Sequence, residues 1–139
     1  MKKKPLLTSV PTLSCPCGTG SDYHDCCERF HKSAPAPTAQ QLMRARYSAY
    51  VLNDTAFIAA TWHPTTRPQL EERVAGETDN RWLGLEVRHA CETGDEATVE
   101  FVARYKSGGR AQRLHEVSRF VREAGLWWYL DGSFPKASM

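Results

Sequence analysis

Four of the five cysteines in this sequence are crowded into one short segment, SCPCGTGSDYHDCCERFH, which runs from Ser14 to His31. Cys15 and Cys17 are separated by one residue, and Cys26 and Cys27 are adjacent. The segment contains few large apolar side chains, so it cannot bury a hydrophobic core of its own. A bound metal ion or disulfides therefore have to hold its shape.

A structural metal ion explains this crowding better than disulfides, because a disulfide between adjacent cysteines is unfavourable and reduced thiols bind metal in the cytoplasm. Zn²⁺ takes four soft ligands at the corners of a tetrahedron, about 2.3 Å from each sulfur, and is favoured here over an iron–sulfur cluster. The predicted ligands are Cys15, Cys17, Cys26 and Cys27. Because protein then fills all four positions, the site is predicted to be closed and structural rather than catalytic.

The identity of the fourth ligand depends on the backbone. The glycines that follow Cys17 let the chain fold back after the first pair of ligands. Adjacent side chains of an extended strand diverge, so Cys26 and Cys27 can share one ion only where the chain bends sharply. His31, one helical turn beyond Cys27, is an alternative fourth ligand, and His24 is a weaker candidate.

Composition limits the classes of function. The 139 residues are 41% hydrophobic and 24% charged, as in one globular domain with a small appendage. A formal net charge of +2 is too small to predict binding to nucleic acid or an anionic membrane by itself. The first 15 residues begin with lysines but lack a continuous apolar run, so we expect no export signal. No stretch is apolar enough to span a membrane, and we expect a cytoplasmic protein.

Changes in composition divide the chain into four parts. Residues 1–13 are predicted to be a flexible tail, and residues 14–31 form the cysteine motif. Residues 32–37 contain two prolines among small side chains and predict a short, stiff linker. Residues 38–139 carry the remaining apolar side chains and form the predicted main domain.

The main domain is expected to begin with helices. Thr38, followed three residues later by a glutamine, has the pattern of a capping box and predicts a helix that ends near Asn53. Asp54 can cap a second helix that stops before Pro64. A third, shorter helix is expected from Pro68 to about Gly76.

The rest of the main domain alternates with period two, which predicts four strands joined by short turns. The expected strands are Trp82–Cys91, Ala97–Lys106, Arg113–Arg122 and Leu126–Asp131. In the first strand one face is expected to carry Leu83, Leu85, Val87 and Cys91. Helices followed by a meander predict an α+β fold, in which the helices pack on one face of a curved four-stranded antiparallel sheet and form a cone.

The cysteine spacing C-x-C-x8-C-C resembles the SEC-C motif, a zinc-binding module named for the C-terminus of the SecA translocation ATPase. The last ligand of that motif is a histidine next to a cysteine, which implies that adjacent residues can bind one ion. Thr19 stands where the motif usually has serine, and Glu28 stands where a glycine often follows the last pair.

Longer stretches of the chain resemble the YchJ family of bacterial proteins. They are PTAQQLMRARYSAYVLNDTAFIAATWHPTTRP, WLGLEV, VEFVARY and EVSRFVREAGLWWYLDG. Members of that family join an N-terminal SEC-C motif to a domain resembling nuclear transport factor 2, a cone of curved sheet and helices. The resemblance implies this fold but no activity, because the family has no established biochemical function.

No catalytic residue is assigned, although several polar side chains of the main domain were weighed. They are His63, His89, Cys91, His115, Glu116, Ser118 and Arg119. His115 and Glu116 are neighbours on a strand and point to opposite faces, and which of the two faces a cavity is left open. Cys91 is interpreted as a buried, inert thiol, and Arg46 as a side chain that solvates a helix face.

Three functions are considered. The favoured one is a zinc-stabilised binding module, whose motif contacts a protein partner while the cone supports it or holds a small ligand. Protein contact is what the resemblance to SecA implies, because the SecA module contacts a chaperone and lipid. The second is an acid/base enzyme of hydrolase or isomerase type, with a pocket in the cone.

The third function is nucleic-acid binding through the zinc knuckle. Lys2–Lys4, Arg29 and Lys32 would contact phosphates, and Tyr23 and Phe30 would stack on bases. We rank this function last, because the knuckle is partly acidic.

Overall fold

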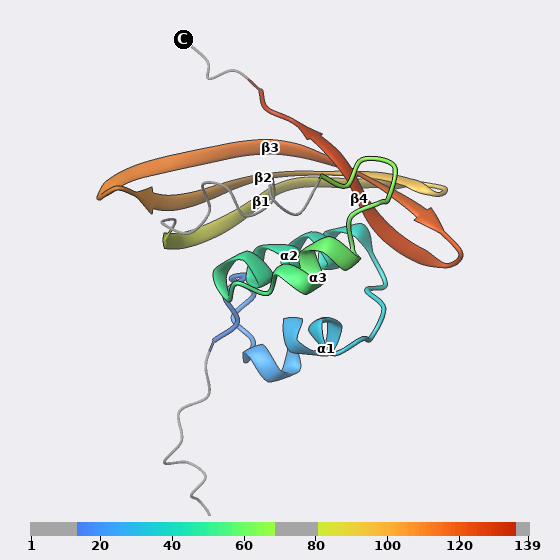
Figure 1. Cartoon of the computed structure of the whole chain (residues 1–139), viewed down its shortest axis with the longest axis horizontal. Coiled ribbons are helices and arrows are strands. Elements are labelled where there is room, and N and C mark those ends of the chain that lie inside the picture. The colour runs from blue at the N-terminus through green and yellow to red at the C-terminus, as the bar shows by residue number, and fades with distance from the viewer. Residues whose placement is uncertain (1–13, 69–80, 136–139) are drawn as a thin grey trace, which may run out of the picture.

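The structure of the chain is a computed structural model in which residues 14–68 and 81–135 are described. Figure 1 shows three layers: the sheet, then α2 and α3 across one of its faces, then α1 and the cysteine-rich segment beyond α2. The helical elements are η1 (Tyr23–Asp25, one 3-10 turn), α1 (Cys27–His31), α2 (Ala39–Val51) and α3 (Thr55–Ala60). Within the described residues, no helix has the length and apolar character needed to cross a bilayer.

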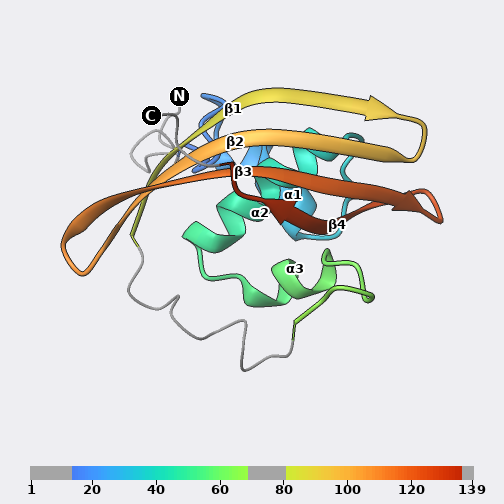
Figure 2. The same ribbon diagram turned by 90° about the horizontal axis from the view of Figure 1, so that it is seen from above.

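The sheet is an antiparallel meander with its strands in sequence order, as predicted. The strands are β1 (Arg81–Thr93), β2 (Glu96–Ser107), β3 (Arg110–Glu123) and β4 (Leu126–Ser133). Gly108 and Gly109 both have positive φ and form the two-residue turn between β2 and β3, a conformation that matches the twist of a hairpin. The long strands curve over α2 and α3 (Figures 1 and 2), which confirms the predicted α+β fold.

Both predicted helix caps are present. The side chain of Thr38 accepts a hydrogen bond of 3.1 Å from the Gln41 N–H at the start of α2. The carboxylate of Asp54 accepts one of 3.1 Å from the Phe57 N–H at the start of α3. The third helix predicted from Pro68 to Gly76 falls almost entirely on residues outside the described ranges.

α2 is buried on two sides. Its sheet-facing side belongs to the main core, which contains Ala39, Leu42, Met43, Tyr47, Ala97, Val99, Phe101, Ala103, Phe120 and Trp127. A second cluster joins the other side of α2 to the cysteine-rich segment and contains Cys15, Cys17, Cys27, Phe30 and Ala45. The segment is therefore packed against the main domain.

The predicted face of β1 is wrong at two positions, because the pairing of β1 with β2 shifts twice. The first shift leaves Leu83 as an extra residue between Trp82 and Gly84, and Leu83 is 53% exposed. The second lies between Val87 and His89, and it reverses the faces of the residues that follow. Cys91 is consequently exposed rather than buried.

The faces of β3 are also settled. Glu116 pairs with Phe101 and Ser118 pairs with Val99, both in the main core, so these two polar side chains face the helices. His115 lies on the opposite face.

Candidate metal centre and buried polar cluster

The four sulfur atoms predicted to bind metal meet at one point. The Sγ atoms of Cys15, Cys17, Cys26 and Cys27 all lie within 4.8 Å of one another. Cys26 Sγ lies 3.6 Å from Cys17 Sγ and 4.0 Å from Cys27 Sγ. Four sulfurs at about 2.3 Å from a tetrahedral ion are separated by about 3.8 Å, so this all-sulfur donor set fits Zn²⁺. The four cysteines are placed to hold a metal ion.

The backbone brings adjacent residues to one ion at Cys26. This residue has φ −124° and ψ −106°, between the end of η1 and the start of α1. It supplies the sharp bend that two adjacent ligands require. In the turn that contains the first pair of cysteines, Gly18 has φ +86°. Its N–H donates a 3.2 Å hydrogen bond to the Cys15 carbonyl, which closes the turn around Cys17.

The pKa values of three thiols in the cluster are shifted in different directions. A hydrogen bond from the Cys27 thiol, assisted by Thr19, lowers the pKa of Cys17 to about 4. The same hydrogen bond and burial raise the pKa of Cys27, and burial raises that of Cys26. Cys17, Cys26 and Cys27 can therefore be thiolates together only beside a cation, which is the electrostatic condition that a bound metal ion supplies.

His31, the alternative ligand, uses both ring nitrogens elsewhere. Its Nε2 donates a hydrogen bond of 2.8 Å to the Ala45 carbonyl on α2, so Nδ1 is the acceptor for the hydroxyl of Tyr23 at 2.6 Å. The ring also packs edge-on against Phe57, with 4.6 Å between centroids. In this arrangement His31 joins α1 to α2. His24, the weaker candidate, is exposed and bonded to Glu28.

Polar contacts also join the cysteines to α2. The Ser48 hydroxyl lies 3.5 Å from Cys15 Sγ, and Arg44 donates a 2.7 Å hydrogen bond to the Cys17 carbonyl. The cysteine cluster and α2 therefore share an interface, and a displacement of the cysteines would alter the contacts of α2.

Most of the polar candidates in the main domain lie apart from one another. Three pair with residues other than candidates: His63 with Glu123, His115 with Glu100, and Arg119 with Asp131. His89 and Cys91 are exposed on β1. Only Glu116 and Ser118 of this group meet, with the Ser118 hydroxyl donating to the Glu116 carboxylate at 2.8 Å.

Glu116 belongs to a buried polar cluster under the sheet. Its Oε2 also accepts a 2.8 Å hydrogen bond from the Tyr129 hydroxyl. Arg46, 5% exposed, stacks on the Tyr129 ring at 4.3 Å and donates a 2.8 Å hydrogen bond to the Ile58 carbonyl. The expectation that Arg46 solvates a helix face is wrong. The cavity beside the cluster has a volume of about 60 Å³, room for about two water molecules.

Sequence reasoning missed Arg46 and Tyr129 as partners of Glu116. A usable signal was present, because Arg46 lies three residues after Met43 and four residues before Tyr50. These spacings place all three side chains on one side of a helix. Arg46 therefore falls within an otherwise apolar stripe, where a charged side chain has to find buried partners.

The comparisons with known proteins agree with this architecture. A family model described as "YchJ, middle NTF2-like domain" matches residues 38–132. The chain belongs to the YchJ family. Relatives named as UPF0225 proteins cover nearly its whole length. One from Ralstonia nicotianae is 56% identical over 136 residues, 88% of this chain and 92% of the relative. One from Bordetella pertussis is 50% identical over 137 residues, 95% of this chain and 98% of the relative.

Two solved structures are similar over the cysteine motif and the YchJ domain together. The solution structure of a SEC-C motif containing protein from Rhodopseudomonas palustris has a TM-score of 0.82 and 34% identity, covering 89% of this chain and all of that one. The crystal structure of a SEC-C motif containing protein from Psychrobacter arcticus has a TM-score of 0.75 and 30% identity, covering 96% and 88%. The predicted family, SEC-C motif and fold are confirmed.

Proposed function

We propose that this chain is a zinc-stabilised binding module in which Cys15, Cys17, Cys26 and Cys27 hold one structural Zn²⁺. The observation that carries the proposal is the convergence of four sulfur atoms within 4.8 Å. Four protein ligands complete the tetrahedron, so the ion stabilises the fold and has no open position for a substrate. The proposal places the chain in the cytoplasm, where thiols stay reduced.

The contacts of His31 support Cys27 as the fourth ligand. A histidine that donates from Nε2 and accepts at Nδ1 has no lone pair left for a metal ion. Cys27, in contrast, is buried within the sulfur cluster.

Metal analysis of purified variants tests this ligand set. We expect one zinc ion per wild-type chain, retained by His31→Gln and lost by Cys27→Ser. Cys91→Ser is the matched control, because Cys91 is an exposed cysteine away from the cluster, and it should keep its zinc. Retention by Cys27→Ser together with loss in His31→Gln would falsify the assignment.

The binding partner in this proposal is a protein that contacts the outward side of residues 18–25. That side is largely exposed around the buried sulfurs, so a metal-ordered surface is available. Immobilised wild-type chain and Cys91→Ser should capture the same proteins, whereas Cys27→Ser and metal-free chain should not. Equal capture by the metal-free chain would refute the partner role and leave the zinc site standing.

The two other functions receive less support. The cavity beside Glu116 and Arg46 is too small for an organic substrate. For nucleic-acid binding, one of the two expected stacking residues, Phe30, is buried at 6% exposure, and the Tyr23 hydroxyl is bonded to His31.

A further inference from the structure

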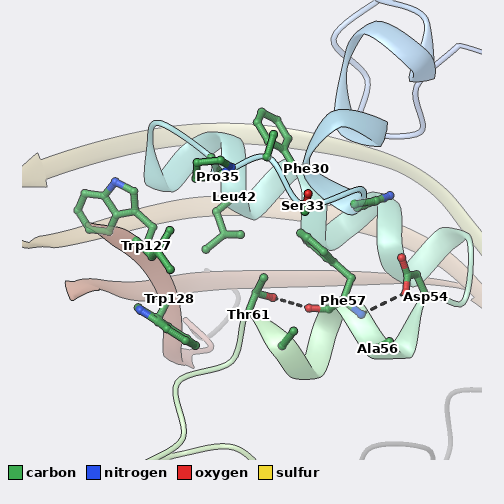
Figure 3. A pocket seen from close by; sticks show the side chains of 15 residues that line it. Phe30, Ser33, Pro35, Leu42, Asp54, Ala56, Phe57, Thr61, Trp127 and Trp128 are labelled. Carbon is green, nitrogen blue, oxygen red and sulfur yellow. Dashed lines mark hydrogen bonds between the residues drawn. The ribbon is translucent and has the colours of Figure 1, made fainter. Parts of the chain in front are cut away.

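A second, larger cavity lies where the cysteine-rich segment, α3 and β4 meet (Figure 3). Its volume is about 390 Å³, within the range of about 300–1,000 Å³ that small-ligand sites occupy. Aromatic side chains from three separate elements line it: Phe30 from α1, Phe57 from α3, and Trp127 and Trp128 from β4. Small side chains such as Ala56 and Ala60 leave space between them.

Three of the polar side chains around this cavity already bond within the protein, whereas the Nε1–H of Trp127 is a buried donor with no hydrogen-bond partner among the described residues. Figure 3 shows that the Asp54 carboxylate accepts from the Phe57 N–H and that the Thr61 hydroxyl donates to the Phe57 carbonyl. His31 has partners at both ring nitrogens. Among the described residues that line the cavity there is no lysine or arginine, and Asp54 is the one carboxylate. An anion would meet an acidic, otherwise apolar wall.

We propose that this cavity binds a small, neutral, planar aromatic molecule, and that its affinity for that molecule is coupled to zinc at the four cysteines. The aromatic walls offer stacking and edge contacts, and a lining with few unpartnered polar groups leaves apolar burial as the main source of affinity. The coupling, but not the cavity itself, rests on the proposed zinc site.

The coupling follows from how one wall is attached. Phe30 lies three residues after Cys27 on α1, which has five residues, too short to be stable by itself. The linker residues Ser33–Ala36 continue this wall. Loss of the metal ion releases the start of α1 and loosens the wall. By linkage, a molecule that needs the wall in place must in turn strengthen zinc binding.

Calorimetric titration with two naphthalene probes tests the ligand class. 2-Naphthol is uncharged near neutral pH, and naphthalene-2-sulfonate has the same ring with a negative charge. We expect 2-naphthol to bind at least about tenfold more tightly, in line with the cost of placing an anion beside Asp54. Equal affinity for the two probes overturns the preference for neutral ligands.

A pair of matched variants tests the location. Ala60→Phe adds a ring to an exposed position of α3 that lines the cavity, and Ala111→Phe makes the same change on exposed β3 away from it. Binding of 2-naphthol should fall at least about tenfold in Ala60→Phe alone; unchanged binding there overturns the site. An uncharged leucine–tryptophan peptide is the third probe. If this peptide binds wild type but not Ala60→Phe, and 2-naphthol binds neither, the occupant is a peptide and the small-molecule proposal is wrong.

The coupling to zinc is tested by measuring 2-naphthol binding to Cys27→Ser, with Cys91→Ser as the control. The zinc content of each variant is measured as well. Affinity for 2-naphthol should fall about tenfold when zinc is lost, and saturating 2-naphthol should raise the zinc affinity of wild type by the same factor. Unchanged 2-naphthol affinity in zinc-free Cys27→Ser overturns the coupling while the zinc site stands. A wild-type chain that binds no zinc refutes the proposed function, while the Ala60→Phe comparison still decides the cavity.

Discussion

Gly132 on β4 shows how tightly single residues surround the buried carboxylate of Glu116. A Cβ at position 132 would overlap the Glu116 side chain, whereas a Cβ at Gly84 would meet nothing within 4 Å. We expect Gly132→Ala to lower the free energy of unfolding by about 1–3 kcal/mol, because overpacking displaces the carboxylate from its partners. Urea unfolding measures the change, with Gly84→Ala as control. Equal losses in the two variants would contradict this explanation.

Tyr129 links the same cluster to pH. Burial, followed by the negative charge of Glu116, raises the pKa of the Tyr129 hydroxyl in the folded state, and Arg46 opposes the shift. Because the folded pKa exceeds the unfolded value of about 10, this contribution to stability is complete below about pH 10 and is lost as pH rises above it. Urea unfolding between about pH 8 and pH 11 should show a shallower decline for Tyr129→Phe than for wild type. Parallel declines would exclude Tyr129 as the cause.

At the residue scale, the sequence was sufficient to predict which cysteines converge and insufficient to predict the residues that surround them. The spacing of the cysteines predicted which residues meet, because all four lie within one short segment and local geometry decides their approach. It did not distinguish Cys27 from His31, since that choice depends on a contact between His31 and Ala45 of α2. Glu116 and Arg46 meet across the core, which no local pattern encodes.

At the scale of the secondary-structure elements, the turn between β3 and β4 has a strained backbone conformation. Ala124 and Gly125 form this two-residue turn with φ of +53° and +78°, and alanine pays a steric cost at positive φ. Ala124→Asn should raise the free energy of unfolding by about 1 kcal/mol, because Asn-Gly is preferred in such turns. Thermal unfolding provides the measurement, and Ala111→Asn on exposed β3 is the control. A stability equal to wild type would show that the turn is not strained.

The number and order of the strands were predictable from the sequence. In β1, however, the alternation of apolar residues did not predict correctly which side chains are buried. Period-two patterning assumes unbroken pairing, but two register shifts in β1 move Leu83 and Cys91 into solvent. Such shifts arise from pairing with β2 and from the curvature of the sheet. The helix caps at Thr38 and Asp54, which depend on neighbouring residues alone, were predicted correctly.

For the whole molecule, the metal centre and the sheet should lose structure separately. The main core contains no residue of the 14–31 segment, so removal of zinc should expose the backbone amides of this segment and leave β2 and β3 protected. Hydrogen exchange followed by mass spectrometry, with and without a chelator, measures this difference, and Cys27→Ser should reproduce the chelated pattern. Loss of protection throughout the sheet would mean that zinc supports the entire fold.

The three-layer arrangement was only half predictable. Helices on a sheet followed from the order of the elements, but no pattern in the sequence predicted that the 14–31 segment packs against α2. The buried residues on both sides of α2 show this contact, because Ala45 and Ser48 face the cysteines while Leu42 and Met43 face the sheet. A helix covered on two sides needs small or apolar residues around most of its circumference.

The bend at Cys26 has a consequence for the order of events during synthesis. By letting adjacent side chains reach one point, it confines the four converging sulfur atoms to the stretch from Cys15 to Cys27. In the zinc-bound form that we propose, a nascent chain can therefore capture its ion soon after this stretch leaves the ribosome, without any contact from the strands still to be made. The helix that packs against residues 14–31 is α2, and α2 is the next long helix to be translated.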